Sequence, residues 1–447
     1  MMTHRSTRTA LLGGAVGLLV LAASGASAAP QPGAADLGLM QGFPPPADKA
    51  ITLANHMFPP FNRWTFQHLR ELHPTREISR GEGASSTLAE EPLDLDGVTG
   101  SVRSGRKLSL GQFLDESHTD AFLVLHRGRL VYERYFNGQQ RHTRHTMFSG
   151  TKSFVGTLML MMIEEGKIDP ARTVASYVPE LKDSAFGDAT VQQVLDMTTA
   201  LEYLEAYTDP NSDFGRYGMV WRFWGPPPVG YKGPRTTYEF LPTLQRKMGK
   251  HGEAFHYVTP NTDVLGWILR RVSGKSVDQL IGERLWQPLG AERDGYIAVD
   301  DGGTEGAGGG LAITARDAAR FGQMILQGGH FNGREVLPAA VAKRILQPGD
   351  PDTFTRYYKQ LAGTFPEVKW YGEVTYAYHD QWWTFNNEHK TVSAIGVYGQ
   401  YIWIDPVAQM VVVKQSSSPD PEGGANWSND TDGPLLYMAL AKHLMKH

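Results

Sequence analysis

The sequence of 447 residues contains no cysteine. A chain without cysteine has no disulfide bond, no cysteine nucleophile, no thiolate metal site and no cysteine-linked lipid anchor. Basic residues are not in excess either, since 43 Lys and Arg stand against 47 Asp and Glu. Because phosphate binding depends on clustered Lys and Arg, this balance argues against nucleic acid as the main partner.

Long hydrophobic runs are confined to one stretch near the N-terminus. Two arginines precede the apolar residues 10–23, and the small residues 26–28 follow them. This order is typical of a secretory signal peptide, and the stretch is shorter than the roughly 20 residues that span a bilayer. The sequence therefore predicts a signal peptide over 1–28, cleavage after Ala28, and a secreted or periplasmic protein without a stable membrane anchor. A retained helical anchor is the alternative.

The rest of the chain has an ordinary globular composition, with 41% apolar and 20% charged residues. Residues 29–118 are punctuated by proline and glycine, which predicts an N-terminal arm that packs on a main body at 119–447. Strand-like runs at 121–125 and 130–135 flank Arg127-Gly128, which is a hairpin signal. The body is therefore expected to begin with a β-hairpin.

Residues 149–165 have a helical pattern that is apolar on most faces and ends at Gly166, so we expect a helix that is buried nearly all round. Helical periods continue over about 167–327. Strand patterns then return before a closing helix, at 392–397, 400–404 and 410–414 for the strands and 434–445 for the helix. This order predicts an α/β (α+β) fold into which an all-helical subdomain is inserted.

Ser149 and Lys152 are the first candidates for catalysis, because residues three apart on a helix share a face and can touch. A serine hydroxyl is a poor nucleophile at neutral pH, but a lysine whose pKa is lowered by burial can act as its base. The same spacing recurs at Ser104 and Lys107 in a polar stretch, whereas Ser149 begins a buried helix directly after a hairpin. There the helix N-terminus points backbone N–H groups at developing negative charge. The alternative is that Ser149 only caps this helix.

Two later segments add candidate residues. Tyr257 precedes an apolar helix, and a phenol near an ammonium can shuttle a proton between nucleophile and leaving group; the alternative is a packing residue. Glycines in the strand-like segment 393–400 permit close approach of a substrate, and the alternative is a β-bulge. His142 and His145 lie in a polar loop, and we interpret them as surface residues and not as metal ligands.

These segments, in this order, resemble the serine β-lactamase and penicillin-binding superfamily, in its class C-like branch of esterases and amidases. The glycine turn at 308–311 matches the same family, and the resemblance extends from about residue 119 to the C-terminus. Within the branch, the sequence is most similar to the aminohexanoate-dimer hydrolases, which cleave nylon oligomer amides. That similarity lies in 64–76, 148–154, 201–203, 207–210, 255–266 and 395–400. The resemblance implies a β-lactamase-like antiparallel sheet flanked by helices.

The resemblance also implies a mechanism that needs no cofactor and no metal. Lys152 takes the proton of Ser149 as the serine Oγ attacks a carbonyl carbon. The backbone N–H groups of Ser149 and Val397 form the oxyanion hole, and Tyr257 passes a proton to the leaving group. The implied partner is a small-molecule ester or amide substrate. The residues implied to bind it are Tyr207, Thr259, Ile395, Gly396 and Tyr398.

Two departures from the family pattern bear on the substrate. Thr259 stands where the family often has Asn, and Ala394 stands where it usually has Lys or His. In penicillin-recognising members that basic residue meets the substrate carboxylate, so its absence argues against a β-lactamase or a D-Ala-D-Ala peptidase and favours an esterase or linear-amide hydrolase. A catalytically silent envelope-binding protein, a β-lactamase or D-Ala-D-Ala peptidase, and a transesterase remain as alternatives. Six aromatic residues predict a pocket for an apolar chain, although they can also be core residues: Trp221, Trp224, Tyr378, Trp382, Trp383 and Tyr398.

Overall fold

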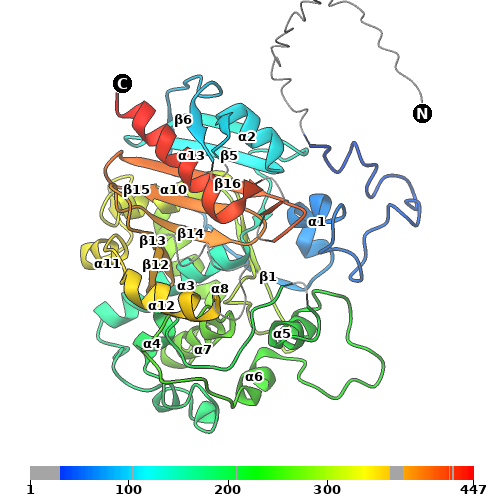
Figure 1. The fold of residues 1–447 in the computed structure, drawn as a ribbon, viewed down its shortest axis with the longest axis vertical. Helices are drawn as coiled ribbons and strands as arrows, with labels where there is room; N and C mark the ends of the chain where they lie inside the picture. Colours follow the sequence, from blue (N-terminus) through cyan, green and yellow to red (C-terminus); the bar gives the residue numbers. More distant parts are fainter. Residues whose placement is uncertain are drawn as a thin grey trace, which may run out of the picture.

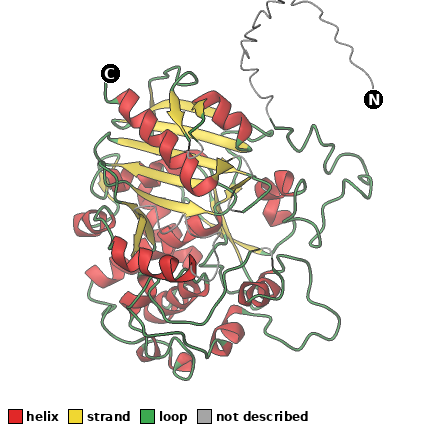
Figure 2. Cartoon of the chain, in the orientation of Figure 1, coloured by secondary structure: helices red, strands yellow, loops and turns green. Residues whose placement is uncertain are grey.

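The structure, a computed structural model, describes residues 31–102, 105–207, 209–362, 376–421, 423–424 and 427–446. The predicted signal peptide and Ser104 lie outside the described residues. A large sheet occupies one half of the molecule and a group of helices the other (Figures 1 and 2). Among the helices of the described ranges, none combines the length and the apolar character that crossing a membrane requires.

An eight-stranded sheet forms the centre of the body. Its strands, in spatial order, are β12 (Tyr376–His379), β13 (Trp382–Phe385), β14 (Val392–Gly396), β15 (Gln400–Asp405), β16 (Met410–Ser416), β5 (Thr119–His126), β6 (Arg129–Tyr135) and β2 (Ala89–Glu90). Neighbouring strands are antiparallel, except that β2 runs parallel to β6. The predicted hairpin and the three predicted C-terminal strands are thus confirmed, and they are neighbours in one sheet.

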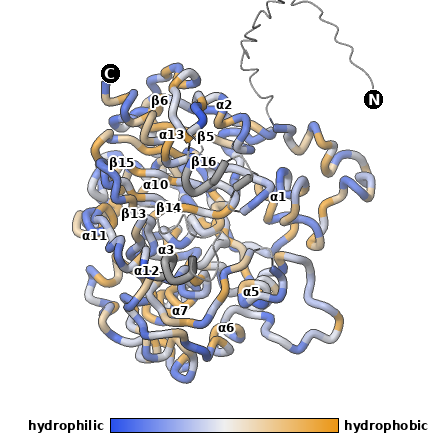
Figure 3. The backbone as a smooth tube through the Cα atoms, viewed as in Figure 1, coloured by the Kyte–Doolittle hydropathy of each residue, from blue (hydrophilic) through white to orange (hydrophobic). Residues whose placement is uncertain are grey.

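Helices cover both faces of this sheet. Successive side chains of a strand point to opposite faces, and the apolar ones form one core on each face. Leu123 of β5 belongs to the core shared with α10 (Ala315–Leu326), which packs on β5, β15 and β16. The next residue toward the N-terminus, Phe122, lies in the opposite core, where it meets Tyr437 of α13 (Asn429–Leu444). Short hydrophobic segments lie along these strands, between hydrophilic ones (Figure 3). The closing helix therefore exists, and it begins earlier than the sequence predicts.

The predicted buried helix is α3 (Thr151–Glu164), in which residues 151–162 are all buried. A 3-10 turn at 148–150 precedes it, so Ser149 lies in this turn, before the N-cap Gly150, and not at the first residue of the helix. Gly166 has a φ of 70°, the left-handed conformation that favours glycine after a helix end. The burial on every face agrees with the apolar pattern of this segment.

The prediction of an all-helical insertion over 167–327 is wrong in one respect, because the segment contains β8 (Gly295–Ala298) and β9 (Leu311–Ile313). These strands form a second sheet of order β1-β8-β9-β7 with β1 (Thr75–Ile78) and β7 (His145–Thr146). All residues of β8 and β9 are buried, so strands this short show no alternation of apolar and polar residues. The segment's α-helices are α4 (Val191–Leu195), α5 (Asp213–Trp221), α6 (Thr237–Phe240), α7 (Pro260–Ser273), α8 (Val277–Ile281), α9 (Gln287–Leu289) and α10.

The N-terminal arm is tied to the body by a buried ion pair. Arg63 of α1 (Asn62–His68) places Nη1 2.9 Å from Oδ1 of Asp120 on β5, and both side chains are buried. His145 contacts the other carboxylate oxygen of Asp120 at 3.0 Å and is fully buried, so its interpretation as a surface residue is wrong. The remaining described α-helices and strands are α2 (Leu110–Glu116), α11 (Ala339–Ile345), α12 (Pro351–Ala362), β3 (Thr99–Ser101), β4 (Lys107–Ser109), β10 (His330–Phe331), β11 (Arg334–Glu335), β17 (Gly423–Gly424) and β18 (Trp427–Ser428).

Candidate active site

Ser149 lies in a sharp turn that an aromatic cluster holds in place. Phe148, the residue before it, has a φ of 43°, a conformation that costs a non-glycine residue roughly 1–2 kcal/mol. The ring centroid of Phe148 lies 4.7 Å from that of Phe66 in the arm and 5.2 Å from that of Tyr398. Packing thus holds the strained turn, and the side chain of Ser149 remains partly exposed.

The end of β14 lies against this turn because Gly396 has no side chain. A Cβ atom at Gly396 would lie 2.1 Å from the carbonyl oxygen of Met147, closer than any Cβ contact found in proteins. The close approach places the next residue, Val397, on the same pocket wall as Ser149. The glycine that the sequence analysis singled out is therefore required by a backbone contact.

Lys152 is buried in the first turn of α3 and is only 1% exposed. Its Nζ lies 3.0 Å from the Oγ of Ser149. Its two other hydrogen-bond partners are the Oγ1 of Thr259 at 3.2 Å and the carbonyl oxygen of Gly308 at 2.5 Å. Burial lowers the pKa of Lys152 to about 8, although two nearby carboxylates oppose the shift. A lysine with this pKa exchanges its proton near neutral pH, which suits a base for Ser149.

Tyr257 lies beside the same amine. The Nζ of Lys152 is 5.2 Å from the centroid of the Tyr257 ring. That ring stacks on Trp383 at 5.7 Å and meets Tyr378 edge-on at 6.2 Å, which fixes its orientation. The structure therefore places the hydroxyl of Ser149 and the ring of Tyr257 beside the buried amine of Lys152.

Glu205 is one of two carboxylates near Lys152 that the sequence analysis did not identify. It accepts hydrogen bonds from both the backbone N–H and the hydroxyl of Thr259. Burial raises the pKa of Glu205, and the charge of Lys152 opposes that shift. Glu205 lies two residues before the predicted substrate-binding Tyr207, but no periodicity or motif marks it in the sequence.

Asp263 is the second carboxylate, in the first turn of α7. It accepts a hydrogen bond from the Tyr217 hydroxyl at 2.7 Å and another from the N–H of Gly308 at 3.0 Å. Asp263 thereby holds the backbone N–H of Gly308, the residue whose carbonyl oxygen contacts Lys152. Burial raises the pKa of Asp263 to about 7. An acidic residue in a first turn is usually explained by the helix dipole, so its position alone does not reveal this contact.

A pocket opens at Ser149 and encloses about 900 Å³, including the part that is open to solvent. Three of the five residues predicted to bind substrate line it: Tyr207, Thr259 and Tyr398. The other two lie elsewhere, since Ile395 is buried in the core that contains Tyr437 and Gly396 packs against Met147. Within the described part of the chain, no three His, Asp or Glu side chains are grouped as metal ligands.

The six aromatic residues predicted for the pocket wall divide into two groups. Three of them line the pocket: Trp221, Trp224 and Tyr398. Tyr378 and Trp383 pack around Tyr257 instead, and Trp382 is fully buried in the core. Both interpretations of these aromatics are therefore correct, each for half of the set.

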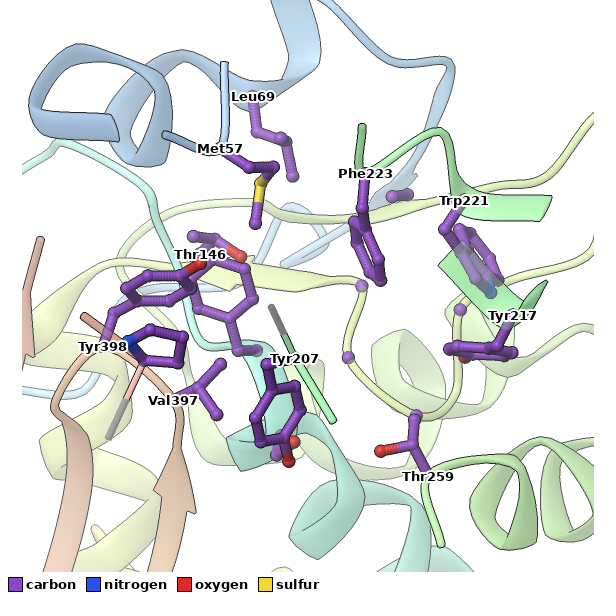
Figure 4. Close-up of a pocket in the computed structure, with 18 of the residues that line it drawn as sticks. Met57, Leu69, Thr146, Tyr207, Tyr217, Trp221, Phe223, Thr259, Val397 and Tyr398 are labelled. Atoms are coloured by element: carbon purple, nitrogen blue, oxygen red, sulfur yellow. The ribbon is translucent and has the colours of Figure 1, made fainter. Parts of the chain in front are cut away.

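The N-terminal arm completes the pocket, which the sequence did not predict. Met57 and Leu69 of the arm lie at one end of the pocket and Tyr207 at the other (Figure 4). His56 and His73 also line it, with their Nε2 atoms 3.0 Å apart. Burial lowers the pKa of His56 to about 4 and that of His73 to about 3, so both are uncharged at neutral pH. The lining thus suits an apolar chain.

This fold is that of a known family. The family model described as Beta-lactamase matches residues 111–432. The chain therefore belongs to the beta-lactamase family, and it is a hydrolase of that family. The resemblance and the α/β fold class inferred from the sequence are both confirmed.

Two relatives match almost the whole chain. A 6-aminohexanoate-dimer hydrolase of Paenarthrobacter ureafaciens is 39% identical over 402 residues, which are 89% of this chain and 96% of the relative. A solved structure from Bacillus anthracis, provisionally named a 6-aminohexanoate-dimer hydrolase, is 32% identical with a TM-score of 0.78 and covers 90% of this chain and 99% of that one. A family VIII carboxylesterase, 18% identical with a TM-score of 0.51, covers 72% of this chain and 92% of its own, and it shares the fold alone.

Proposed function

We propose that this protein is a serine hydrolase that cleaves a linear amide or a carboxylic ester through an acyl-enzyme on Ser149. The main support is the 3.0 Å separation of the Ser149 Oγ and the Lys152 Nζ, in a site where burial lowers the pKa of Lys152 to about 8. At pH 7 about one tenth of such a lysine is neutral, and only the neutral amine can accept the serine proton.

The reaction we propose assigns one step to each of the three groups. Lys152 accepts the proton of Ser149 as Oγ attacks the carbonyl carbon. The N–H groups of Ser149 and Val397 stabilise the resulting oxyanion, at about 3–4 kcal/mol for each donor. Tyr257 passes the proton from Lys152 to the leaving nitrogen or oxygen as its bond to carbon breaks. Water then attacks the acyl-enzyme, releases the acid and returns a proton to Ser149.

The substrate we propose is a linear amide or ester with an apolar chain next to the scissile bond. Aromatic and aliphatic side chains such as Met57, Phe214 and Trp221 line the pocket and favour a hydrocarbon chain over a charged group. Because the 39% identical relative is a 6-aminohexanoate-dimer hydrolase, linear oligomers of this type are the first amides to test. Tyr207 lines the pocket, where its hydroxyl can meet the amide nitrogen.

We propose further that the protein is exported, which residues 1–28 support by their pattern. N-terminal sequencing of the protein recovered outside the cytoplasm should give Ala29 as the first residue. Full-length protein retained in the membrane fraction would contradict cleavage.

The serine mechanism is tested by labelling with a fluorophosphonate probe. The wild-type protein should be modified at Ser149, and Lys152→Ala should lose the label because no base remains to activate the hydroxyl. Ser149→Ala should abolish hydrolysis of every substrate while its thermal melt stays close to that of the wild type. A catalytically silent binding protein would remain unlabelled at any pH.

Substrate profiling separates the remaining alternatives. The panel contains p-nitrophenyl esters, aminohexanoate oligomers and nitrocefin. Esters or oligomers should be cleaved, whereas rapid turnover of nitrocefin would show that the missing basic residue at Ala394 does not exclude β-lactams. Product analysis with an added alcohol distinguishes hydrolysis from transesterification.

A further inference from the structure

A chain of hydrogen bonds connects the proposed nucleophile with Glu205. The Nζ of Lys152 lies 3.0 Å from Ser149 Oγ and 3.2 Å from Thr259 Oγ1. The hydroxyl of Thr259 donates to Oε1 of Glu205, and its backbone N–H donates to Oε2 at 3.0 Å. Tyr207 contributes a further hydrogen bond to the same carboxylate. Both oxygens of Glu205 are thus held by the residue that contacts the amine.

The direction of these bonds decides how the lysine can act. Because Thr259 gives its only hydroxyl hydrogen to Glu205, its oxygen offers Lys152 lone pairs alone. The carbonyl oxygen of Gly308, 2.5 Å from Nζ, is also only an acceptor. A neutral amine has two hydrogens, which these two acceptors satisfy, so its lone pair is left for the hydroxyl of Ser149. The carboxylate of Glu205 therefore determines which way the base faces.

We propose that Glu205 is a positioning residue for acylation: it keeps Thr259 an acceptor, directs the lone pair of Lys152 at Ser149 and sets the pH range in which this amine is a base. The inference rests on the proposed serine mechanism and adds to it a residue outside the Ser-x-x-Lys and Tyr motifs. Glu205 acts through Thr259 and Lys152, since these two residues separate it from the nucleophile.

The charge of Glu205 also acts on Lys152 directly. Two carboxylates favour the ammonium form, and Glu205 raises the pKa of Lys152 more strongly than Asp263 does. Among the described residues, phenols also face Lys152 or Glu205: Tyr203, Tyr207, Tyr217 and Tyr257. Replacing Glu205 with a neutral residue therefore lowers the pKa of Lys152.

Glu205→Gln is the main test. A glutamine has one acceptor oxygen, which the N–H of Thr259 occupies, so its amide hydrogens face the Thr259 hydroxyl and turn that hydroxyl toward the lone pair of Lys152. We measure kcat/KM for p-nitrophenyl butyrate, an ester without ionising groups, from about pH 5 to about pH 10. The plateau should fall by about tenfold or more, and the acidic limb should move to lower pH by about one unit.

Two further variants test the same chain without altering the carboxylate. Thr259→Val removes the bridging hydroxyl and should move the limb in the same direction by a smaller amount, because Glu205 keeps its charge. Thr259→Ser keeps the hydroxyl and should retain the wild-type limb. Glu202→Gln is the matched control, since it removes an exposed carboxylate that pairs with Arg246 on the surface. The acidic limb of the pH profile of Glu202→Gln should not move.

The outcomes separate this inference from the proposed function. A limb that stays in place in both Glu205→Gln and Thr259→Val, with activity lowered equally at every pH, would show a purely structural role and overturn the inference. If Glu205→Gln does not fold, Thr259→Val and Thr259→Ser decide instead: an acidic limb that stays in place in Thr259→Val overturns the inference. A wild-type protein that a fluorophosphonate does not label at Ser149 would refute the serine mechanism itself, whereas labelled wild type with an unmoved limb refutes only the role of Glu205.

Discussion

Gly396→Ala adds one heavy atom, the Cβ, at the contact between β14 and the turn that carries Ser149. The added Cβ would lie 2.1 Å from the carbonyl oxygen of Met147, and 3.1 Å from the side chain of Gln400. The first neighbour is backbone and cannot rotate away, so β14 and the turn must separate by about 1 Å. Such a misplacement costs about a hundredfold in rate where reacting groups must be held in position.

This loss equals about 3 kcal/mol of transition-state stabilisation, similar to the removal of one oxyanion-hole donor. The agreement is expected, because Val397, the proposed second donor, follows Gly396 directly. We therefore expect kcat to fall by about a hundredfold with a smaller change in KM, since the separation affects the reacting carbonyl at Ser149 and Val397 more than the far end of the pocket. Steady-state kinetics with p-nitrophenyl butyrate measures both parameters.

Gly111→Ala is the control for Gly396→Ala. Its added Cβ would meet no neighbour closer than 3.6 Å, an ordinary contact, and the residue lies in α2. Alanine is favoured over glycine in a helix by about 1 kcal/mol, so the control should be at least as stable as the wild type and fully active. A Gly396→Ala protein that is folded and has wild-type kcat would refute the reasoning, because the contact would then be unimportant for catalysis.

Three other substitutions test the arm, the core and the pocket. Arg63→Met should destabilise the protein by about 3 kcal/mol in urea unfolding, because it leaves the buried Asp120 without its cation, and the double variant with Asp120→Asn should recover part of the loss. Lys414→Met should stabilise the protein at pH 7 and have less effect near pH 10. Burial lowers the pKa of Lys414 to about 7. The free-energy penalty for burying this amine is therefore complete below that pH, and it disappears as the pH rises toward the pKa of the lysine in the unfolded chain. Trp221→Ala should lower kcat/KM for p-nitrophenyl hexanoate by about tenfold more than for the acetate, because the ring lines the pocket.

Each of these has a clear contrary result. An unchanged urea midpoint in Arg63→Met would show that the ion pair does not hold the arm. A loss of stability in Lys414→Met at pH 7 would show that the amine is not penalised by burial. Equal losses for short and long esters in Trp221→Ala would place the acyl chain elsewhere.

The sequence by itself determined the features that depend on neighbours along the chain. The hairpin around Arg127-Gly128 follows from two apolar runs and a turn, and α3 follows from one continuous apolar helical segment. The contact between Ser149 and Lys152 was predictable for the same reason, because three residues of helical backbone bring two side chains to one face. These features are set by local geometry, which is the same wherever the segment is placed.

Only the tertiary structure decided the surroundings of that pair. Glu205, Gly308 and Lys152 are far apart in the sequence, and nothing local to Glu205 shows that it meets the lysine through Thr259. The same holds for β8 and β9, whose few residues are buried entirely, and for His145, whose polar sequence neighbours give no sign of its burial beside Asp120. Packing brings these groups out of water and next to one another, and this determines their pKa values, hydrogen-bond directions and chemistry.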